Sequence, residues 1–215
     1  MRLSEWRWSV PRLRRLLCPP NRLMLDPWVT RQANRLEGLI VNVGSGEDLR
    51  HFGRRTVHVD AHAPAVSVRA DLSAGLPFCD AVFDGAICTE VLEHVLDDRA
   101  TLSEISRVLK PGGRLVVTVP FMFRYHPDPA DFRRYTPAGL RISLEREGFD
   151  IDELAGLGGR LLALVLWVDS LHLLVRVPLR CSLQLLRFPI AAMAERGAGW
   201  SDYAANAVAV ARRRS

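Results

Sequence analysis

The chain has 215 residues, of which 48% are hydrophobic and 25% charged. This composition is ordinary for a globular protein and excludes a wholly disordered chain. The length predicts one main domain and argues against two independent catalytic domains, since domains average about 100 to 200 residues. The 29 basic and 24 acidic residues give a net charge of +5, which is compatible with an acidic substrate, a phospholipid surface or nucleic acid. We attribute the arginine excess to genomic base composition and expect no nucleic-acid partner.

The four cysteines are scattered along the chain, at Cys18, Cys79, Cys88 and Cys181. Their spacing supports neither a zinc site nor a disulfide framework, and the N-terminus lacks the apolar run of a secretory signal. We therefore expect a cytoplasmic protein.

Residues 1–35 combine many arginines with three tryptophans. Pro19 and Pro20 would interrupt any helix here, because proline lacks the amide donor. We interpret this zone as a basic aromatic arm that is either a solvated tail or an active-site lid, with membrane attachment as a third hypothesis.

Residues 36–159 alternate short β-branched runs with amphipathic stretches, a pattern typical of βαβ units. The predicted class is α/β, with a Rossmann-like doubly wound and mainly parallel sheet. Helices are expected at 91–109 and from Thr136 to Glu147, the second capped by Thr136 before Pro137. The predicted strands are 39–43, 56–60, 65–69, 82–87, 114–119 and 149–155.

Residues 160–200 are rich in Leu, Val and Ala, but prolines and charged residues interrupt them. The run without charge at 161–168 is far shorter than the roughly 20 residues of a membrane-spanning helix. We expect a helical insertion that either covers the core or contacts the inner membrane face, where a lipid-linked acceptor could bind. Residues 201–215 should form the last strand, at about 206–212, and a basic tail.

A glycine turn follows the first predicted strand, where Val43 leads into Gly44, Ser45 and Gly46. Glycines permit a sharp turn and a close approach to a ligand, and we expect a helix to follow. The next strand ends in Asp60, where a carboxylate can bind ribose hydroxyls. The third is followed by Asp71 and Leu72, which suit an adenine ring. Ligands of open α/β sheets bind at this edge, so the three strand ends predict an adenosine site.

With the segments F-D-G-A-I-C-T-E-V-L-E-H at 83–94 and L-K-P-G-G-R-L at 109–115, the chain resembles the class I S-adenosylmethionine-dependent methyltransferases. The resemblance covers about residues 36–155 and is greatest to enzymes of small-molecule, ubiquinone, polysaccharide and natural-product pathways. It implies S-adenosylmethionine as cofactor. Successive segments of the chain would contact the methionine part of the cofactor, its ribose, its adenine and the region near its sulfonium. The implied cofactor-binding residues are Val43, Gly44, Ser45, Gly46, Asp60, Ala61, Asp71, Leu72, Thr89 and Glu90.

Two positions depart from the family pattern, which usually has an acidic residue at Asn42 and a third glycine at Asp48. Asn42 could still accept a hydrogen bond from the cofactor's ammonium. Because its side chain is uncharged, the affinity of the protein for the cofactor would be weaker than with an acidic residue. A cofactor-binding relic without activity is therefore an alternative.

The segment after the fifth strand leaves the edge where related enzymes receive their acceptor. An oxygen acceptor usually needs a base, and we predict His126 for that role, with Asp131 and His94 as further catalytic candidates and Asp128 as another potential base. The alternative is that His126, Asp131 and Arg134 hold the loop together through hydrogen bonds.

Glu90, Glu93 and His94 also suggest a divalent-cation site, as is thought for some ubiquinone-pathway relatives. Two carboxylates and one imidazole suit Mg²⁺ or Mn²⁺ only moderately. A capping glutamate and a histidine lining the cofactor pocket explain the cluster better, so no metal ligand is predicted.

The predicted function is methyl transfer from S-adenosylmethionine to an oxygen or nitrogen of a small-molecule, saccharide or lipid-linked acceptor. A nicotinamide-dependent oxidoreductase is disfavoured, because Leu49 stands where G-x-G-x-x-G needs its third glycine. A noncatalytic membrane-associated module, built on the arginine arm and the apolar insertion, is the second alternative. The oligomeric state is not predicted.

Overall fold

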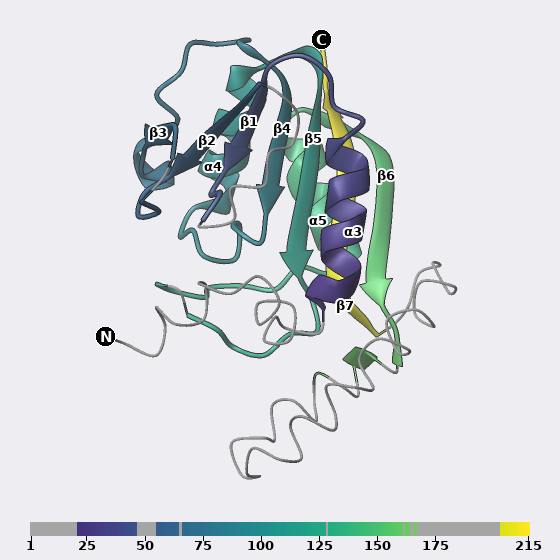
Figure 1. Ribbon diagram of the computed structural model, residues 1–215. Coiled ribbons are helices and arrows are strands. Elements are labelled where there is room, and N and C mark those ends of the chain that lie inside the picture. Colours follow the sequence, from purple (N-terminus) through teal and green to yellow (C-terminus); the bar gives the residue numbers. More distant parts are fainter. Residues whose placement is uncertain are drawn as a thin grey trace.

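In the part of the chain that the structure describes, seven strands form a single sheet in the order β3-β2-β1-β4-β5-β7-β6 (Figure 1). The computed structural model describes residues 21–46, 55–64, 66–127, 129–160, 162, 163, 166 and 203–215. The strands are β1 (Ile40–Val43), β2 (Thr56–Asp60), β3 (Val68–Arg69), β4 (Phe83–Thr89), β5 (Leu109–Pro120), β6 (Phe149–Gly158) and β7 (Ala204–Arg213). The helices are α3 (Arg22–Ala33), the 3₁₀ turn η1 (Leu72–Ala74), α4 (Asp98–Val108) and α5 (Pro137–Arg146).

Strands β1 to β5 pair in parallel, and β7 enters between β5 and β6 in the antiparallel direction. The mainly parallel α/β sheet predicted from the sequence is thereby confirmed, including a last strand near residue 206. Since β1, β2, β3, β4 and β5 share one direction, their carboxyl ends lie along one edge of the sheet, where ligands of open α/β sheets bind.

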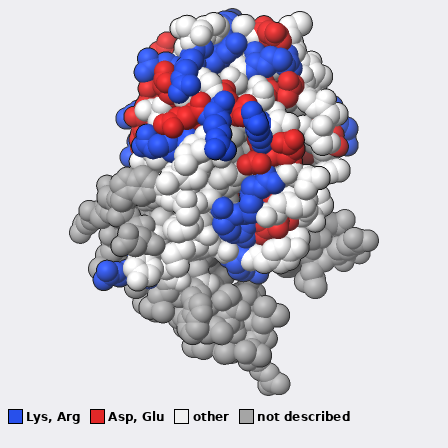
Figure 2. All heavy atoms as spheres, turned by 180° about the vertical axis from the view of Figure 1, so that it is seen from behind, with Lys and Arg blue, Asp and Glu red and all other residues white. Residues whose placement is uncertain are grey.

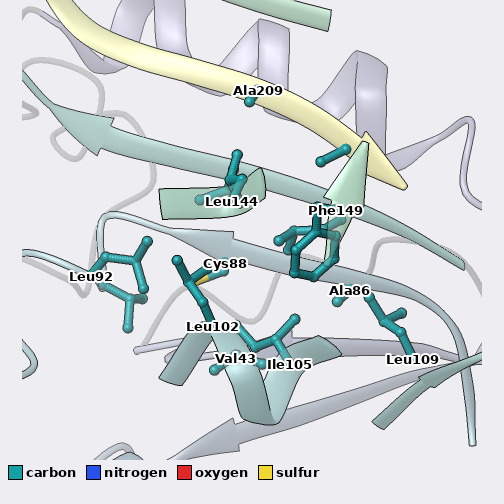
Figure 3. Packing of buried hydrophobic residues seen from close by; sticks show 14 of the residues in the cluster. Val43, Ala86, Cys88, Leu92, Leu102, Ile105, Leu109, Leu144, Phe149 and Ala209 are labelled. Carbon is teal, nitrogen blue, oxygen red and sulfur yellow. The ribbon is translucent and has the colours of Figure 1, made fainter. Parts of the chain in front are cut away.

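Successive residues of each strand serve opposite faces of the sheet, as the two-residue period requires. Val41 and Val43 of β1 belong to the core cluster that includes residues of α4 and α5, whereas Ile40 packs in the cluster with α3. Figure 3 shows the first of these clusters, with Leu102 and Ile105 of α4, Leu144 of α5 and Phe149 of β6 among its members. Helices thus cover both faces, as in a doubly wound fold.

The expected N-terminal arm requires correction in its last third. Residues Arg22–Ala33 form α3, which packs onto the sheet through the fully buried Leu25 and the largely buried Trp28 and Val29. Burial of these apolar side chains favours docking over a mobile lid. Residues 1–20, most of the predicted insertion at 160–200, Asp128 and the helix predicted after Gly46 lie outside the described residues.

The helix expected at 91–109 begins seven residues later, at Asp98. Asp97 is its N-cap, and the side chain of Asp97 accepts a hydrogen bond from the amide of Ala100. The apolar spacing at 91–95 reflects burial in a turn instead, since Val91 and Leu92 are core residues. The helix from Pro137 has the predicted Thr136 cap and ends at Arg146.

The outer face formed by α4 and α5 carries basic and acidic side chains in close alternation (Figure 2). Arg107 pairs with Asp80 at 2.7 Å, and Arg99 pairs with Glu147 at 2.7 Å. The charges of Arg107 and Arg99 are therefore neutralised by acidic neighbours on this face. Among the helices of the described part of the chain, none is long and apolar enough to cross a membrane.

Candidate active site

The predicted cofactor residues meet at the carboxyl edge of the sheet. Val43, the last residue of β1, pairs with Val59 of β2 on one side and with Cys88 of β4 on the other. Asp60 in turn pairs with Arg69, the last residue of β3. The strand ends that carry the glycine turn, Asp60, Asp71 and Thr89 are therefore neighbours in space, as the sequence predicted.

The glycine turn is held in a conformation that favours glycine at two positions. Gly44 has φ 65° and Gly46 has φ 56°, both in the left-handed region. The amides of Gly44 and Ser45 donate to the carbonyl of Val59, at 2.8 and 3.1 Å, which ties the turn to β2. The Ser45 hydroxyl is buried and has no hydrogen-bond partner among the described residues. Buried hydroxyls are nearly always hydrogen-bonded, so this hydroxyl is suited to bind a polar group of a ligand.

Asp60 holds the turn from the neighbouring strand. Its Oδ2 accepts a hydrogen bond from the amide of Gly46 at 2.9 Å, and its Oδ1 accepts from His62 and Ala63 at 2.8 and 2.9 Å. Partial burial acts to raise the pKa of Asp60, but these three amide donors outweigh it and lower the pKa. The side chain is thus an ionised acceptor, and a carboxylate oxygen that receives one bond can accept another.

Asp71 and Leu72 lie just beyond β3. The Asp71 carboxylate caps η1 by accepting hydrogen bonds from the amide and hydroxyl of Ser73, at 2.9 and 2.8 Å. These bonds lower the pKa of the exposed Asp71. The amide of Ala70 donates to the carbonyl of Asp60 at 3.2 Å, which keeps this turn beside the Asp60 carboxylate.

Thr89 ends β4, and the chain reverses sharply at Glu90, which has φ 55°. A positive φ at a residue other than glycine is a strained conformation that clusters at functional sites. The Glu90 carboxylate accepts hydrogen bonds from the Thr118 hydroxyl at 3.0 Å and the Asn206 amide at 2.9 Å. Asn206 is a buried residue of β7 that the sequence analysis did not single out, since nothing in its local pattern distinguishes it.

The loop that leaves β5 is organised around Asp131, whose side chain is fully buried. Arg134 donates two hydrogen bonds to this carboxylate, one of them at 2.6 Å, and the amide of His126 donates to it at 2.8 Å. Arg134, the strongest of these influences, lowers the pKa of Asp131 well below its usual range. The hypothesis that His126, Asp131 and Arg134 hold the loop together is confirmed.

The two histidines predicted as catalytic meet at Glu93. His94 Nε2 lies 3.6 Å and His126 Nε2 lies 3.9 Å from Glu93 Oε1, and the two rings lie edge to face with centroids 5.0 Å apart. Burial, followed by the charge of Glu90, raises the pKa of Glu93 to about 9. Burial also lowers the pKa of His126, although Asp131 opposes that shift. We refer to Glu93, His94 and His126 as the histidine cluster.

Asn42 is buried on β1, where the family pattern has an acidic residue. Its side-chain amide contacts His58 Nδ1 of β2 at 3.3 Å. An amide NH₂ is always a donor, so it donates to the ring nitrogen here. Asn42 therefore uses its NH₂ within the sheet, and its carbonyl oxygen is the atom that could meet a cofactor.

Sequence comparison relates the centre of the chain to known enzymes. Residues 37–117 match the methyltransferase domain family. The chain is 39% identical over 88 residues to an O-methyltransferase of Aspergillus nomiae, covering 36% of this chain. It is 35% identical over 80 residues to a demethylmenaquinone methyltransferase of Symbiobacterium thermophilum, covering 37% of this chain. These matches span only 39% and 32% of the two relatives.

Structural comparison extends the similarity over most of the chain. A S-adenosylmethionine-dependent methyltransferase from Mesorhizobium loti superposes with a TM-score of 0.57 at 16% identity, covering 87% of this chain and 96% of the other. A [4+2]-cyclase superposes with a TM-score of 0.59 at 20% identity, covering 89% and 80%. A fold shared at such low identity does not by itself define the reaction. Residues 37–117 thus resemble the methyltransferase domain family, and the chain as a whole shares the fold of solved methyltransferases.

Proposed function

We propose that this protein transfers a methyl group from S-adenosylmethionine to an oxygen or nitrogen of a small-molecule acceptor. The observation that carries the proposal is the contact between the glycine turn and Asp60, in which the amide of Gly46 donates to the carboxylate at 2.9 Å. A turn fixed in this way beside an ionised carboxylate suits an adenosyl ligand. Saccharide and lipid-linked acceptors belong to the same hypothesis.

Different residues at the carboxyl edge would bind different parts of the cofactor. Asp60 would bind the ribose hydroxyls, and Asp71 and Leu72 would contact the adenine. Gly44, Ser45 and Gly46 would follow the methionine part, and the buried Ser45 hydroxyl supplies a donor that has no partner among the described residues. Bound there, S-adenosylmethionine supplies an electrophilic methyl group that an acceptor can attack in line.

The histidine cluster and the loop after β5 would form the acceptor side. His126 is the proposed base, with Asp131 as its positioning residue: the Asp131 carboxylate lies 3.1 Å from His126 Nδ1 and accepts a hydrogen bond from the His126 amide. An imidazole oriented by a carboxylate can receive the proton of a hydroxyl as the methyl group transfers. Exposed Met122, Tyr125 and Phe132 on the same loop offer apolar contacts to a hydrophobic acceptor.

The function is tested by incubating the purified chain with S-adenosylmethionine that carries an isotope-labelled methyl group and an extract of its own cells. We expect the label to appear in a small product, which mass spectrometry would then identify. Calorimetry with S-adenosylhomocysteine and with NAD is the accompanying binding measurement. Binding of NAD without any response to S-adenosylhomocysteine would favour an oxidoreductase over the methyltransferase.

Asp60→Ala is expected to weaken binding of S-adenosylhomocysteine by about 1 to 3 kcal/mol, because charged hydrogen bonds to the ribose are lost. The substitution also releases the amide of Gly46, so the turn loses part of its support. Isothermal titration calorimetry measures the change in dissociation constant.

Asp150→Ala is the matched control for this change. Asp150 is an exposed aspartate near the start of β6, at the opposite edge of the sheet, where it pairs with Arg214 at 2.8 Å. We expect its dissociation constant to equal that of the unmodified chain. An Asp60→Ala protein that also binds with unchanged affinity would remove the ribose assignment.

A further inference from the structure

We propose that the histidine cluster binds a transition-metal ion of the zinc type. Glu93 and His94 follow β4, and His126 lies on the loop after β5, so two separate segments contribute the ligands. One potential ligand atom from each residue lies within 4.8 Å of the other two. The site itself does not depend on the proposed methyl transfer.

The distances within the cluster fit a shared ion better than direct hydrogen bonds. At 3.6 and 3.9 Å from Glu93 Oε1, the two Nε2 atoms are beyond normal hydrogen-bond range. Two ligand atoms that each lie about 2.1 Å from one zinc ion in tetrahedral geometry are about 3.4 Å apart. The two distances from Glu93 to the imidazoles exceed this spacing by a few tenths of an ångström, and all three ligand atoms lie within 4.8 Å of one another, so a rearrangement of the imidazoles would bring them into the first coordination sphere of one ion.

Both imidazoles are oriented with Nε2 as the unprotonated nitrogen. His94 Nδ1 donates a hydrogen bond to the carbonyl of Ala130. His126 Nδ1 lies 3.1 Å from the carbonyl of Arg124 and 3.1 Å from Asp131 Oδ2, both of which are acceptors. Nη2 of Arg134, a donor, lies farther from His126 Nδ1, at 3.4 Å. The two closer acceptors therefore favour a ring proton on Nδ1, which leaves the Nε2 lone pairs for a metal. Metal-binding histidines are commonly fixed by such outer contacts.

Glu93 supplies an independent indication of a missing partner. Its side chain is completely buried, and neither carboxylate oxygen has a hydrogen-bond partner among the described residues. Buried polar atoms are nearly always paired, because desolvation without a partner is costly. An ion between Glu93 and the two imidazoles would satisfy this carboxylate.

Glu90 is excluded from the ligand set by its own contacts. Thr118 and Asn206 donate to its two carboxylate oxygens, which turns the side chain toward β5 and β7. The cluster therefore differs from the Glu90, Glu93 and His94 combination considered from the sequence. Replacing a carboxylate by the imidazole of His126 changes the preferred metal from a hard cation such as Mg²⁺ to Zn²⁺ or a similar ion.

Three protein ligands leave one position of a tetrahedral zinc ion open, as in catalytic zinc sites. If the proposed function is correct, this open position would face the acceptor. The catalytic role of the ion rests on the proposed function, whereas the binding of the ion does not. A hydroxyl bound to the ion would have a lowered pKa, and its proton would pass to solvent. Its oxygen would then form a bond to the methyl carbon while the carbon–sulfur bond breaks and S-adenosylhomocysteine leaves. His126 would then act as a ligand, and the ion would take over the task assigned to the base.

The test uses the full chain after treatment with a chelator and removal of the chelator by dialysis. Titration with Zn²⁺ alone, followed by calorimetry, is expected to give one equivalent bound per chain. Co²⁺ is the spectroscopic probe, because its visible absorption reports tetrahedral nitrogen and oxygen coordination. Absence of stoichiometric Zn²⁺ binding would overturn the proposal, and so would tighter binding of Mg²⁺ than of Zn²⁺.

Variants identify the ligands. Glu93→Gln and His126→Ala are each expected to weaken Zn²⁺ binding at least about 10-fold and to abolish the Co²⁺ spectrum, since loss of even an outer contact costs about 10-fold to 100-fold. His62→Ala and Glu145→Gln are the controls and should bind Zn²⁺ like the unmodified chain, because neither side chain belongs to the histidine cluster. Because Glu93 is buried, His126 on its loop gives a second variant that preserves the core. Equal losses in the controls would refute the assigned ligands.

Binding of S-adenosylhomocysteine is measured on the same preparations. Zinc binding without S-adenosylhomocysteine binding would support the metal site and reject the proposed methyl transfer. The reverse result would reject the metal site and leave the methyltransferase proposal intact. The two hypotheses are therefore separable.

Discussion

His126→Ala is expected to lower the rate of methyl transfer by about 10²-fold to 10⁴-fold, the range contributed by a positioned base. Binding of S-adenosylhomocysteine should change little, because the cofactor residues lie on other strand ends. The measurements are the initial rate of label transfer into the identified product and the dissociation constant by calorimetry. A loss of turnover at constant cofactor affinity indicates an interaction made in the reaction step.

Arg141→Ala is a suitable control for this experiment. Arg141 lies on the exposed surface of α5 and pairs only weakly with Glu145, at 3.6 Å. It should retain full activity. If the His126→Ala protein has the same rate as this control, His126 is not the base, and its role is limited to holding the loop together. A base and a metal ligand both predict a slow variant, and the zinc titration distinguishes them.

Gly44→Ala is expected to destabilise the ligand-binding conformation of the glycine turn by about 2 to 5 kcal/mol, and to weaken binding of S-adenosylhomocysteine by at most that amount, from two physical causes. The left-handed conformation costs an alanine about 1 to 2 kcal/mol, and overpacking adds about 1 to 3 kcal/mol. The second cost arises because a Cβ at this position would lie 2.5 Å from Val91 Cγ2. The turn must then move away from the ligand position.

Gly46→Ala separates these two causes. Gly46 is also left-handed, with φ 56°, but a Cβ there meets no atom within 4 Å in the described residues. This variant should therefore show the conformational cost alone. Adding Val91→Ala to Gly44→Ala should recover the steric part of the loss. Calorimetry measures cofactor binding, and urea denaturation checks that each variant unfolds cooperatively. If Gly44→Ala and Gly46→Ala behave identically, contact with Val91 is not important.

The local sequence predicted the sheet and the cofactor edge with good accuracy. The short β-branched apolar runs of β1 and β5 and the Thr136 cap of α5 are properties of adjacent residues, so they are visible in a single chain. Asp60 and the glycine turn were found because a parallel sheet brings strand ends to one edge whatever the detailed packing. The predicted adenosine site follows from that topology.

Local sequence patterns gave wrong predictions for segments whose structure depends on contacts with distant parts of the chain. The apolar residues at 91–95 have helical spacing, yet the cap at Asp97 and burial of Leu92 produce a turn before α4. Likewise, α3 contains arginines and a proline, and only contact of Leu25 and Trp28 with the sheet shows that it belongs to the core. Tertiary packing overrides propensity in both segments.

The sequence by itself determined the fold class, the order of the candidate cofactor residues along the chain and the edge of the sheet where a ligand would bind. Only the tertiary structure decided which side chains share a partner on the acceptor side. Glu90 is satisfied by Asn206 from β7, whereas Glu93 is left with two imidazoles and no donor among the described residues. Such pairings join residues on different strands and loops, and they depend on side-chain direction and burial, which sequence spacing does not encode.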